Sequence, residues 1–265
     1  GRDEADFSNP EGLRRHVRET NPDVIVNAVA YTAVDKAEEN EELANIINGV
    51  SPGVLAEEAI KINALLVHYS TDYVFDGTKK SPYVETDEPN PINAYGRTKF
   101  AGEQAIQSSG CDYLIFRTSW VYASRGNNFL LTIIKLAKER EELSVVADQI
   151  GSPTSARLIA ETTSHCVHQA IKEKQAGMFI SDLYHLTASA YTSWHGFAKE
   201  IVYAVHKKLN IQLKVKDLKA IPTANYPTPA SRPMNSQLSL LKLEKVFNVK
   251  MPDWRQTLSL CLEEI

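Results

Sequence analysis

The 265-residue chain has few cysteines, no long apolar run and no excess of basic residues. Cys111, Cys166 and Cys261 are widely separated, match no zinc spacing and cannot all pair, which favours a reducing cytoplasm. No apolar run reaches the roughly 18 residues that a membrane span needs. A net charge of -4 offers no basic surface for nucleic acid. We therefore expect a cytoplasmic protein that binds neither membrane nor nucleic acid.

Short apolar runs alternate with helical patterns over the first two thirds of the chain. The apolar runs cover 23–28, 64–69 and 113–116, and the helical patterns cover about 8–20, 34–47, 52–62, 95–108, 128–140 and 156–171. Strands that alternate with helices predict right-handed βαβ units and a parallel sheet covered on both faces. The expected fold class is therefore α/β.

The regular alternation of predicted strands and helices ends toward the carboxyl terminus. One more strand is expected at 184–186, followed by helices at about 193–209, 238–247 and 254–263. A proline-rich stretch over 221–233 is too long for a simple turn, so it is interpreted as a binding loop or an inter-lobe connection.

Three predicted strand ends carry small or polar residues, at 28–32, 70–72 and 118–120. In open α/β sheets, ligands bind outside the carboxyl ends of the strands. Polar residues also occur at a strand end merely because the chain turns there. Three such ends in register nevertheless favour a common cleft.

Tyr95 and Lys99 lie one helical turn apart and share a face of the helix predicted over 95–108. A free tyrosine has a pKa of about 10, too high for efficient proton exchange at neutral pH. A nearby ammonium lowers that pKa, and a hydroxyl such as that of Thr71 can orient the phenol. The pattern predicts a tyrosine that protonates a carbonyl oxygen while a hydride reaches the carbon.

The Tyr-x-x-x-Lys spacing is a weak signal by itself. Tyr203 and Lys207 repeat it in an amphipathic helix that no threonine-tipped strand precedes, and we interpret that pair as a solvated face. The strand end at 70–73 distinguishes the first pair. Metal patterns are weaker still, because the aspartates and paired histidines follow no metal-binding spacing; they are Asp72, Asp76, Asp87, His165 and His168.

Five longer sequence words extend the pattern. They are DFS at 6–8, NAVAYTAVDKAE at 27–38, YSTDYVFDG at 69–77, RTSWVY at 117–122 and TPASRP at 228–233. With these words the chain resembles the dTDP-4-dehydrorhamnose reductase family of the extended short-chain dehydrogenases/reductases, over essentially its whole length. The resemblance implies a Rossmann-like, doubly wound parallel sheet with a smaller, mainly C-terminal substrate-binding lobe.

The resemblance also implies domain limits and an activity. The dinucleotide-binding domain is expected over 1–122 plus about 154–187, and the sugar-nucleotide-binding lobe over about 123–153 and 188–265. The implied reaction is reduction of the C4 carbonyl of dTDP-4-dehydro-L-rhamnose by NADPH or NADH, which yields dTDP-L-rhamnose. The implied partner is thus a dTDP-sugar substrate.

Individual roles follow from the same resemblance. Tyr95 is the implied proton donor, Lys99 binds the nicotinamide ribose and lowers the tyrosine pKa, and Thr71 tunes the tyrosine and touches the sugar. The other implied cofactor contacts are Asp6 and Phe7 beside the adenine, and Ala30, Tyr31, Thr32 and Tyr69 along the nicotinamide cofactor. The implied sugar-nucleotide contacts are Asp72 and Trp120.

Arg232, in the proline-rich stretch, is our own prediction for a diphosphate contact. An arginine fork suits two phosphate oxygens. A salt bridge that ties down the loop is the alternative. The terminal Glu263-Glu264 pair is interpreted as a solvated helix end, with a Mg²⁺ ion or a homodimer contact there as the open alternative.

The chain departs from the family in its glycines. Members open with a strand and a glycine-rich turn that seats the pyrophosphate at a helix amino end, yet no G-x-G-x-x-G occurs here and only Gly1 and Gly12 precede Gly49. A sheet without that first strand would expose unpaired edges. We expect the natural protein to carry this unit, with truncation and disorder both open as reasons for its absence.

Two other functions compete with the reductase. The β subunit of methionine adenosyltransferase, a regulatory protein, resembles the same family, but its matching segment has serine in place of Thr71 and lacks the RTSW word at 117–120 that this chain keeps. A sugar-nucleotide epimerase or dehydratase shares Tyr-x-x-x-Lys and retains its nicotinamide through turnover. Net oxidation of added NADPH separates these from a reductase.

Overall fold

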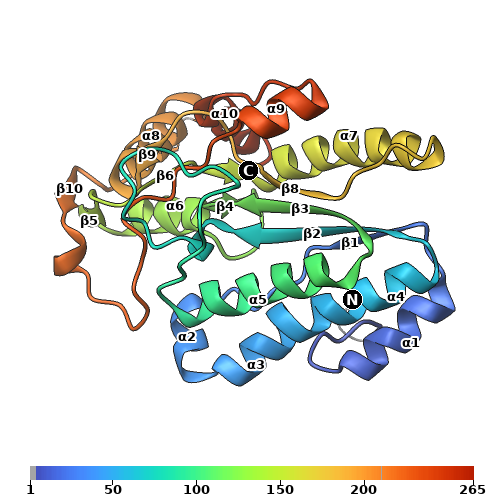
Figure 1. Cartoon of the computed structure of the whole chain (residues 1–265). Coiled ribbons are helices and arrows are strands. Elements are labelled where there is room, and N and C mark those ends of the chain that lie inside the picture. Colours follow the sequence, from blue (N-terminus) through green and yellow to red (C-terminus); the bar gives the residue numbers. More distant parts are fainter. Residues whose placement is uncertain (1–3, 210) are drawn as a thin grey trace.

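The structure, a computed structural model that describes residues 4–209 and 211–265, contains one parallel four-stranded sheet with helices on both faces (Figure 1). Its strand order is β1-β2-β3-β8. The strands are β1 (Val24–Asn27), β2 (Leu65–Thr71), β3 (Asp112–Thr118) and β8 (Asp182–His185). All neighbours are parallel, which confirms the doubly wound α/β prediction. Residues 1–3 and 210, which fall in the predicted domain ranges, lie outside the described residues.

One face of the sheet is covered by the amino-terminal helices. They are α1 (Pro10–Thr20), α2 (Val34–Glu39), α3 (Glu41–Asn45), a π-helical turn (Ile46–Val50), α4 (Ser51–Lys61) and α5 (Ala94–Ser109). Leu13, Val17 and Leu55 pack there against the sheet residues Leu66 and Ile115. Apolar side chains at helical spacing thus form one half of the core.

The prediction of one continuous helix over 34–47 is wrong, because this segment is divided into α2, α3 and the start of the π-helical turn. Asn40 has φ -128° and ψ 44°, outside the helical region, so α2 stops before it. The Asn40 side chain donates to the carbonyl of Lys36, in competition with helical backbone bonds. The start of α1 is as predicted, because Asn9 accepts from the backbone N–H of Gly12 and Pro10 occupies the first turn.

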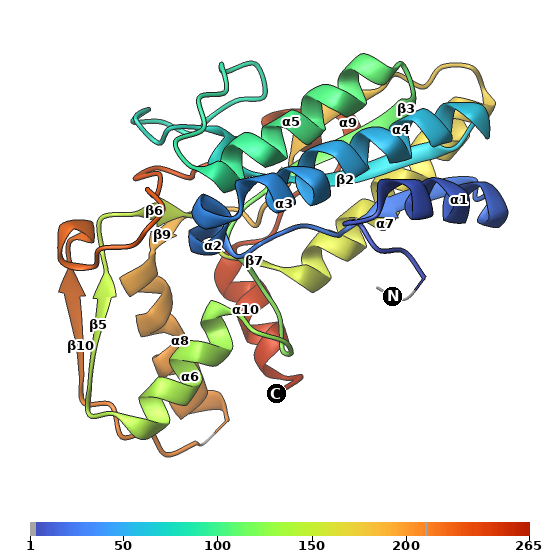
Figure 2. The same ribbon diagram turned by 90° about the horizontal axis from the view of Figure 1, so that it is seen from below.

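The opposite face carries α7 (Ala156–Gln175), α9 (Leu241–Phe247) and α10 (Trp254–Leu262). Beside the sheet, α6 (Phe129–Glu139) and α8 (Trp194–Lys208) pack with a separate strand pair, β5 (Glu142–Val146) and β10 (Asp217–Ile221), as Figure 2 shows. The sequence did not indicate this pair, because three of the five β10 residues are exposed and form no apolar run.

Two short strand pairs and two 3₁₀ turns lie outside the main sheet. β4 (Val121–Tyr122) pairs with β7 (Thr154–Ser155), and β6 (Ile150–Gly151) pairs with β9 (Thr192–Ser193). Two 3₁₀ turns cover Asp72–Val74 and Thr223–Asn225.

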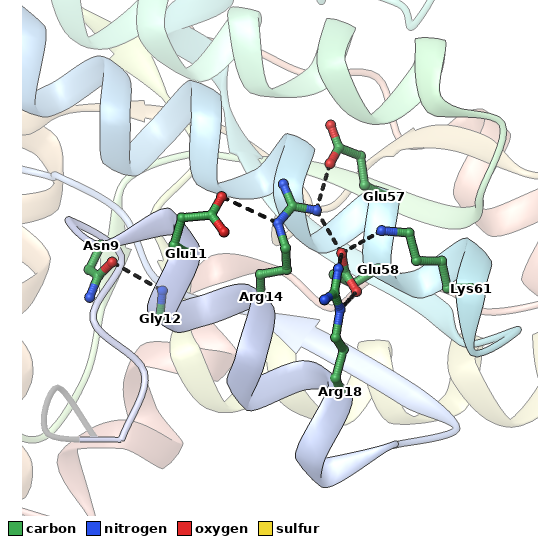
Figure 3. A network of polar contacts seen from close by, with 8 residues as sticks. All are labelled: Asn9, Glu11, Gly12, Arg14, Arg18, Glu57, Glu58 and Lys61. Atoms are coloured by element: carbon green, nitrogen blue, oxygen red, sulfur yellow. Dashed lines mark hydrogen bonds and ion pairs between the residues drawn. The ribbon is translucent and has the colours of Figure 1, made fainter.

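A buried carboxylate fastens α1 to α4. The Glu58 side chain is 0% exposed and accepts hydrogen bonds from Arg14 at 2.6 Å, Arg18 at 2.6 and 2.9 Å, and Lys61 at 2.7 Å (Figure 3). These bonds hold the pKa of Glu58 near 2, against the burial that raises it. The exposed Glu57 adds a second contact to Arg14.

The two edges of the sheet differ. The β8 edge is covered, because the N–H of His185 donates to Glu85 and Lys242 donates to the carbonyl of Leu183. Among the described residues, no strand pairs with the outer edge of β1, where Val26 is 52% exposed.

Candidate active site

The amino end of α5 is held against the end of β2, and this contact positions Tyr95. Asn93 caps the helix by accepting from the N–H of Gly96 at 2.8 Å. A β-carbon at Gly96 would lie 2.2 Å from the carbonyl oxygen of Tyr73, so only glycine permits the approach. The Tyr95 ring consequently meets the Tyr73 ring edge-on, with centroids 5.7 Å apart.

Thr71 and Tyr95 come together as predicted. The Thr71 hydroxyl donates to Oδ1 of Asp72 at 2.9 Å and accepts from the N–H of Tyr73 at 3.1 Å, and it lies close enough to the Tyr95 phenol to lower the pKa of that group. Burial, and next the Asp72 charge, raise the pKa of Tyr95 to about 12, although the Thr71 hydroxyl lowers it. The phenol therefore holds its proton at neutral pH, as a proton donor must.

Asp72 is buried beside this phenol. Burial raises its pKa to about 6, while hydrogen bonds from Ser236 and Thr71 lower it. Its second oxygen, Oδ2, has no partner among the described residues. A buried, unpaired carboxylate oxygen is suited to a substrate hydroxyl.

Lys99 lies beneath the strand ends and is 1% exposed. Its ammonium donates to the carbonyl of Tyr69 at 2.6 Å and lies 3.3 Å from Nε2 of His68. Burial lowers the pKa of Lys99 to about 8, and attraction to Glu103 raises it. That Lys99 lowers the pKa of Tyr95 stays a prediction, because burial dominates the phenol in this arrangement.

Asn48 links the segment after β1 to α5, although no sequence pattern had singled it out. Its Oδ1 accepts from the N–H of Tyr31 at 2.8 Å, and its Nδ2 donates to the Tyr31 carbonyl and to the Thr98 hydroxyl. Asn48 is fully buried in the π-helical turn. π-Helical turns are often found at functional sites.

The remaining predicted cofactor residues are placed as follows. Ala30, Tyr31 and Thr32 follow β1, and Tyr69 is in β2, where its hydroxyl donates to Thr163 at 2.8 Å. Phe7 is 7% exposed and belongs to the core, with its carbonyl accepting from Ser51. Asp6 accepts from the N–H and hydroxyl of Ser8.

The donor set fits the nicotinamide-ribose half of a dinucleotide. A buried ammonium and a phenol stand at the strand ends, and Ser70 and Thr118 present buried hydroxyls without a partner among the described residues. Unpartnered buried polar atoms are uncommon and suit a polar ligand. Lys99, Tyr95 and the loop at 30–32 would hold that half.

Trp120 is stacked on Trp194, with 3.6 Å between the ring centroids and 8° between the planes. Trp194 donates from Nε1 to Gln149 at 3.2 Å. Trp120 has φ 48°, an unusual value for a bulky residue. A β-carbon at Gly151 would lie 2.5 Å from its ring. Trp194, which the sequence did not single out, therefore fixes the orientation of Trp120.

Arg232 forms the salt bridge that the sequence left as its alternative role. Its Nη2 donates to Asp35 at 2.8 Å, and the N–H of Ala230 donates to the same carboxylate. Nη1 of Arg232 is buried and has no partner among the described residues. Asn93 donates to the carbonyl of Ser231, so the proline-rich stretch is tied to the start of α5.

The described residues contain no group of three or more acidic, histidine or cysteine side chains arranged to hold a metal ion. Within the same residues, no helix has the length and apolarity to cross a membrane. At the carboxyl terminus, Glu264 accepts from Ser124 and pairs with Arg157.

The chain is similar to known proteins in both sequence and structure. The family model described as RmlD substrate binding domain matches residues 1–265. The chain is 51% identical to dTDP-4-dehydrorhamnose reductase of Burkholderia thailandensis, with 100% of this chain and 89% of the relative covered. It is 48% identical to the Salmonella typhimurium enzyme of that name, with 98% and 85% covered.

A solved structure shows the same fold. It is the dTDP-4-dehydrorhamnose reductase of Bacillus anthracis in complex with NADP, which is 36% identical and superposes with a TM-score of 0.90. The alignment covers 100% of this chain and 88% of that one.

Proposed function

Since the chain belongs to the RmlD substrate-binding-domain family of dTDP-4-dehydrorhamnose reductases, we propose how its own residues carry out the reduction. The protein is an NAD(P)H-dependent reductase that converts the C4 carbonyl of dTDP-4-dehydro-L-rhamnose to the alcohol of dTDP-L-rhamnose. The observation that carries the proposal is that the Tyr95 phenol lies close to the Thr71 hydroxyl at the end of β2, with the Lys99 ammonium on the same helix.

Tyr95 protonates the carbonyl oxygen. The nicotinamide, when bound, supplies the hydride that reaches C4. Thr71 orients the phenol and presents its hydroxyl to the sugar. Lys99 binds the ribose hydroxyls and places a positive charge near the phenolate that forms when Tyr95 gives up its proton. Tyr69 and the loop at 30–32 line the nicotinamide.

The second lobe holds the sugar nucleotide in this proposal. The rigid Trp120 ring and Asp72 contact the sugar, and the free Nη1 of Arg232 donates to the diphosphate. We also propose two domains. The dinucleotide-binding domain covers residues 1–122 plus about 154–187, and the sugar-nucleotide-binding lobe covers about 123–153 plus 188–265. The separate β5–β10 pair, packed with α6 and α8, supports this division.

Two finer points belong to the same proposal. We infer a cytoplasmic location, supported by three buried free cysteines, which suit a reducing compartment. A homodimer, with or without Mg²⁺ at Glu263-Glu264, is tested by light scattering in the presence and absence of a chelator.

Turnover tests the function. Full-length protein is incubated with dTDP-4-dehydro-L-rhamnose and either NADPH or NADH, and absorbance of the reduced nicotinamide is followed. We expect stoichiometric oxidation and dTDP-L-rhamnose as product. No oxidation with either cofactor would contradict the reductase. Retention of a bound nicotinamide without net oxidation would favour an epimerase or dehydratase.

A further inference from the structure

A buried histidine beside the active-site lysine has no part in the reaction as proposed above. His68 is 0% exposed, and its Nε2 lies 3.3 Å from Nζ of Lys99. Its other ring nitrogen, Nδ1, is 2.9 Å from Nδ2 of Asn27, the residue opposite His68 in the register of β1 and β2. Asn27, His68 and Lys99 therefore form a buried polar chain across two strands and the catalytic helix.

The orientation of Asn27 decides which nitrogen of His68 carries the proton. Oδ1 of Asn27 accepts from the backbone N–H of Val29 at 3.0 Å, so the NH₂ group faces His68. An amide NH₂ only donates, so Nδ1 accepts and a neutral ring carries its proton on Nε2. Burial, and next the Lys99 charge, lower the pKa of His68 well below its usual value, which keeps the ring neutral.

An Nε2–H group directed at Lys99 favours one protonation state of the lysine. It can donate to the lone pair of a neutral amine, whereas it repels an ammonium, which has only donors. Glu103, one turn along α5, attracts the ammonium, but its carboxylate is bound by Arg117 of β3 at 2.9 and 2.6 Å. Tyr95, on the same helix face, is uncharged at neutral pH.

We propose that His68, with its tautomer held by Asn27, is a positioning residue that makes the Lys99 ammonium give up its proton more readily than burial alone would. The inference rests on the proposed function, in which the Lys99 charge stabilises the phenolate of Tyr95. Its consequence is that His68 sets the pH above which the reduction slows, because phenolate formation becomes harder once the ammonium is lost.

The tautomer is measured directly, without turnover. Nitrogen NMR of histidine-labelled protein assigns His68 by the signals that vanish in His68→Gln. We expect the proton on Nε2 and a neutral ring throughout the neutral pH range. A proton on Nδ1, or a charged ring at neutral pH, overturns the inference.

The pH profile of kcat/KM tests the consequence. In His68→Gln the amide can turn its oxygen toward Lys99 and give the ammonium an acceptor, so the basic limb should move up by about one pH unit. Asn27→Asp should move it in the same direction, because the carboxylate accepts from Nδ1–H and leaves Nε2 to accept from Lys99. If His68→Gln does not fold, Asn27→Asp tests the same consequence.

Ile115→Val is the matched control, because Ile115 stands opposite His68 in β3 and loses only apolar contact. Its basic limb should stay in place. If the basic limb of the kcat/KM profile stays in place in both His68→Gln and Asn27→Asp, the inference is overturned. This holds even if kcat/KM falls equally at every pH, because a purely structural role of His68 predicts such a uniform loss. An inactive wild-type protein would contradict the proposed function instead, and the NMR result would still decide the tautomer.

Discussion

The Trp120 ring lies flat on the Trp194 ring and is backed by Gly151, where a β-carbon would come within 2.5 Å of it. Trp194→Ala and Gly151→Ala should each raise the KM for the dTDP-sugar on the order of tenfold, because either change releases or displaces Trp120. Steady-state kinetics and near-UV circular dichroism measure the effect. Trp194→Phe keeps a stacking ring and should change KM less. An unchanged KM in Trp194→Ala would show that the stack does not shape the substrate site.

Tyr95→Phe removes the proposed proton donor and keeps the ring. We expect kcat to fall by about 10²- to 10⁴-fold, the usual contribution of a positioned acid, while cofactor affinity persists. Tyr203→Phe is the matched control, because Tyr203 has the same spacing to a lysine but is 61% exposed. Its kcat should equal that of the wild type. Comparable losses in both variants would refute the assignment.

Lys99 should make stability depend on pH above neutrality. Burial lowers its pKa from 10.5 to about 8, so between these values the unfolded chain binds more protons than the folded one. Stability contributed through this group therefore rises with pH across that window, by about 1–3 kcal/mol in total. Urea unfolding of wild type and Lys99→Met at several pH values measures the difference. If the difference in free energy of unfolding between wild type and Lys99→Met does not change from pH 8 to 10, the lowered pKa of Lys99 is contradicted.

Glu58 should stabilise the packing of α1 on α4. Glu58→Ala leaves Arg14, Arg18 and Lys61 without their shared carboxylate, and we expect the free energy of unfolding to fall by about 1–3 kcal/mol. Glu57→Ala, which removes an exposed contact to Arg14, should cost less than about 1 kcal/mol.

The pH dependence separates the Glu58 charge from its packing. The pKa of Glu58 is lowered from 4.5 to about 2, so its contribution is complete above pH 4.5 and is lost as the pH falls toward 2. Chemical denaturation of both variants across this range tests it. Equal losses in the Glu57 and Glu58 variants at neutral pH would argue against a shared buried anchor.

Local signals in the sequence determined most of the elements. The cap and proline at Asn9-Pro10 predicted where α1 starts, and apolar runs predicted all four strands of the main sheet, because such patterns act between near neighbours. They failed at Asn40, where one side-chain bond ends a helix, and at β10, whose strand pairs on a largely exposed edge. Both depend on contacts that apolar periodicity does not report.

The sequence by itself also predicted that Tyr95 and Lys99 share a helix face near Thr71 at a strand end, from helical spacing and the rule that ligands bind at strand ends. Only the tertiary structure decided what surrounds them. In the sequence, His68 is one more residue of a buried strand. The register of β1 and β2 places Asn27 opposite it, and the two side chains are hydrogen-bonded. Arg232 forms a salt bridge with Asp35, which lies 197 residues away in the sequence. Burial and long-range pairing set the charge and orientation of these groups, and neither property is local in the chain.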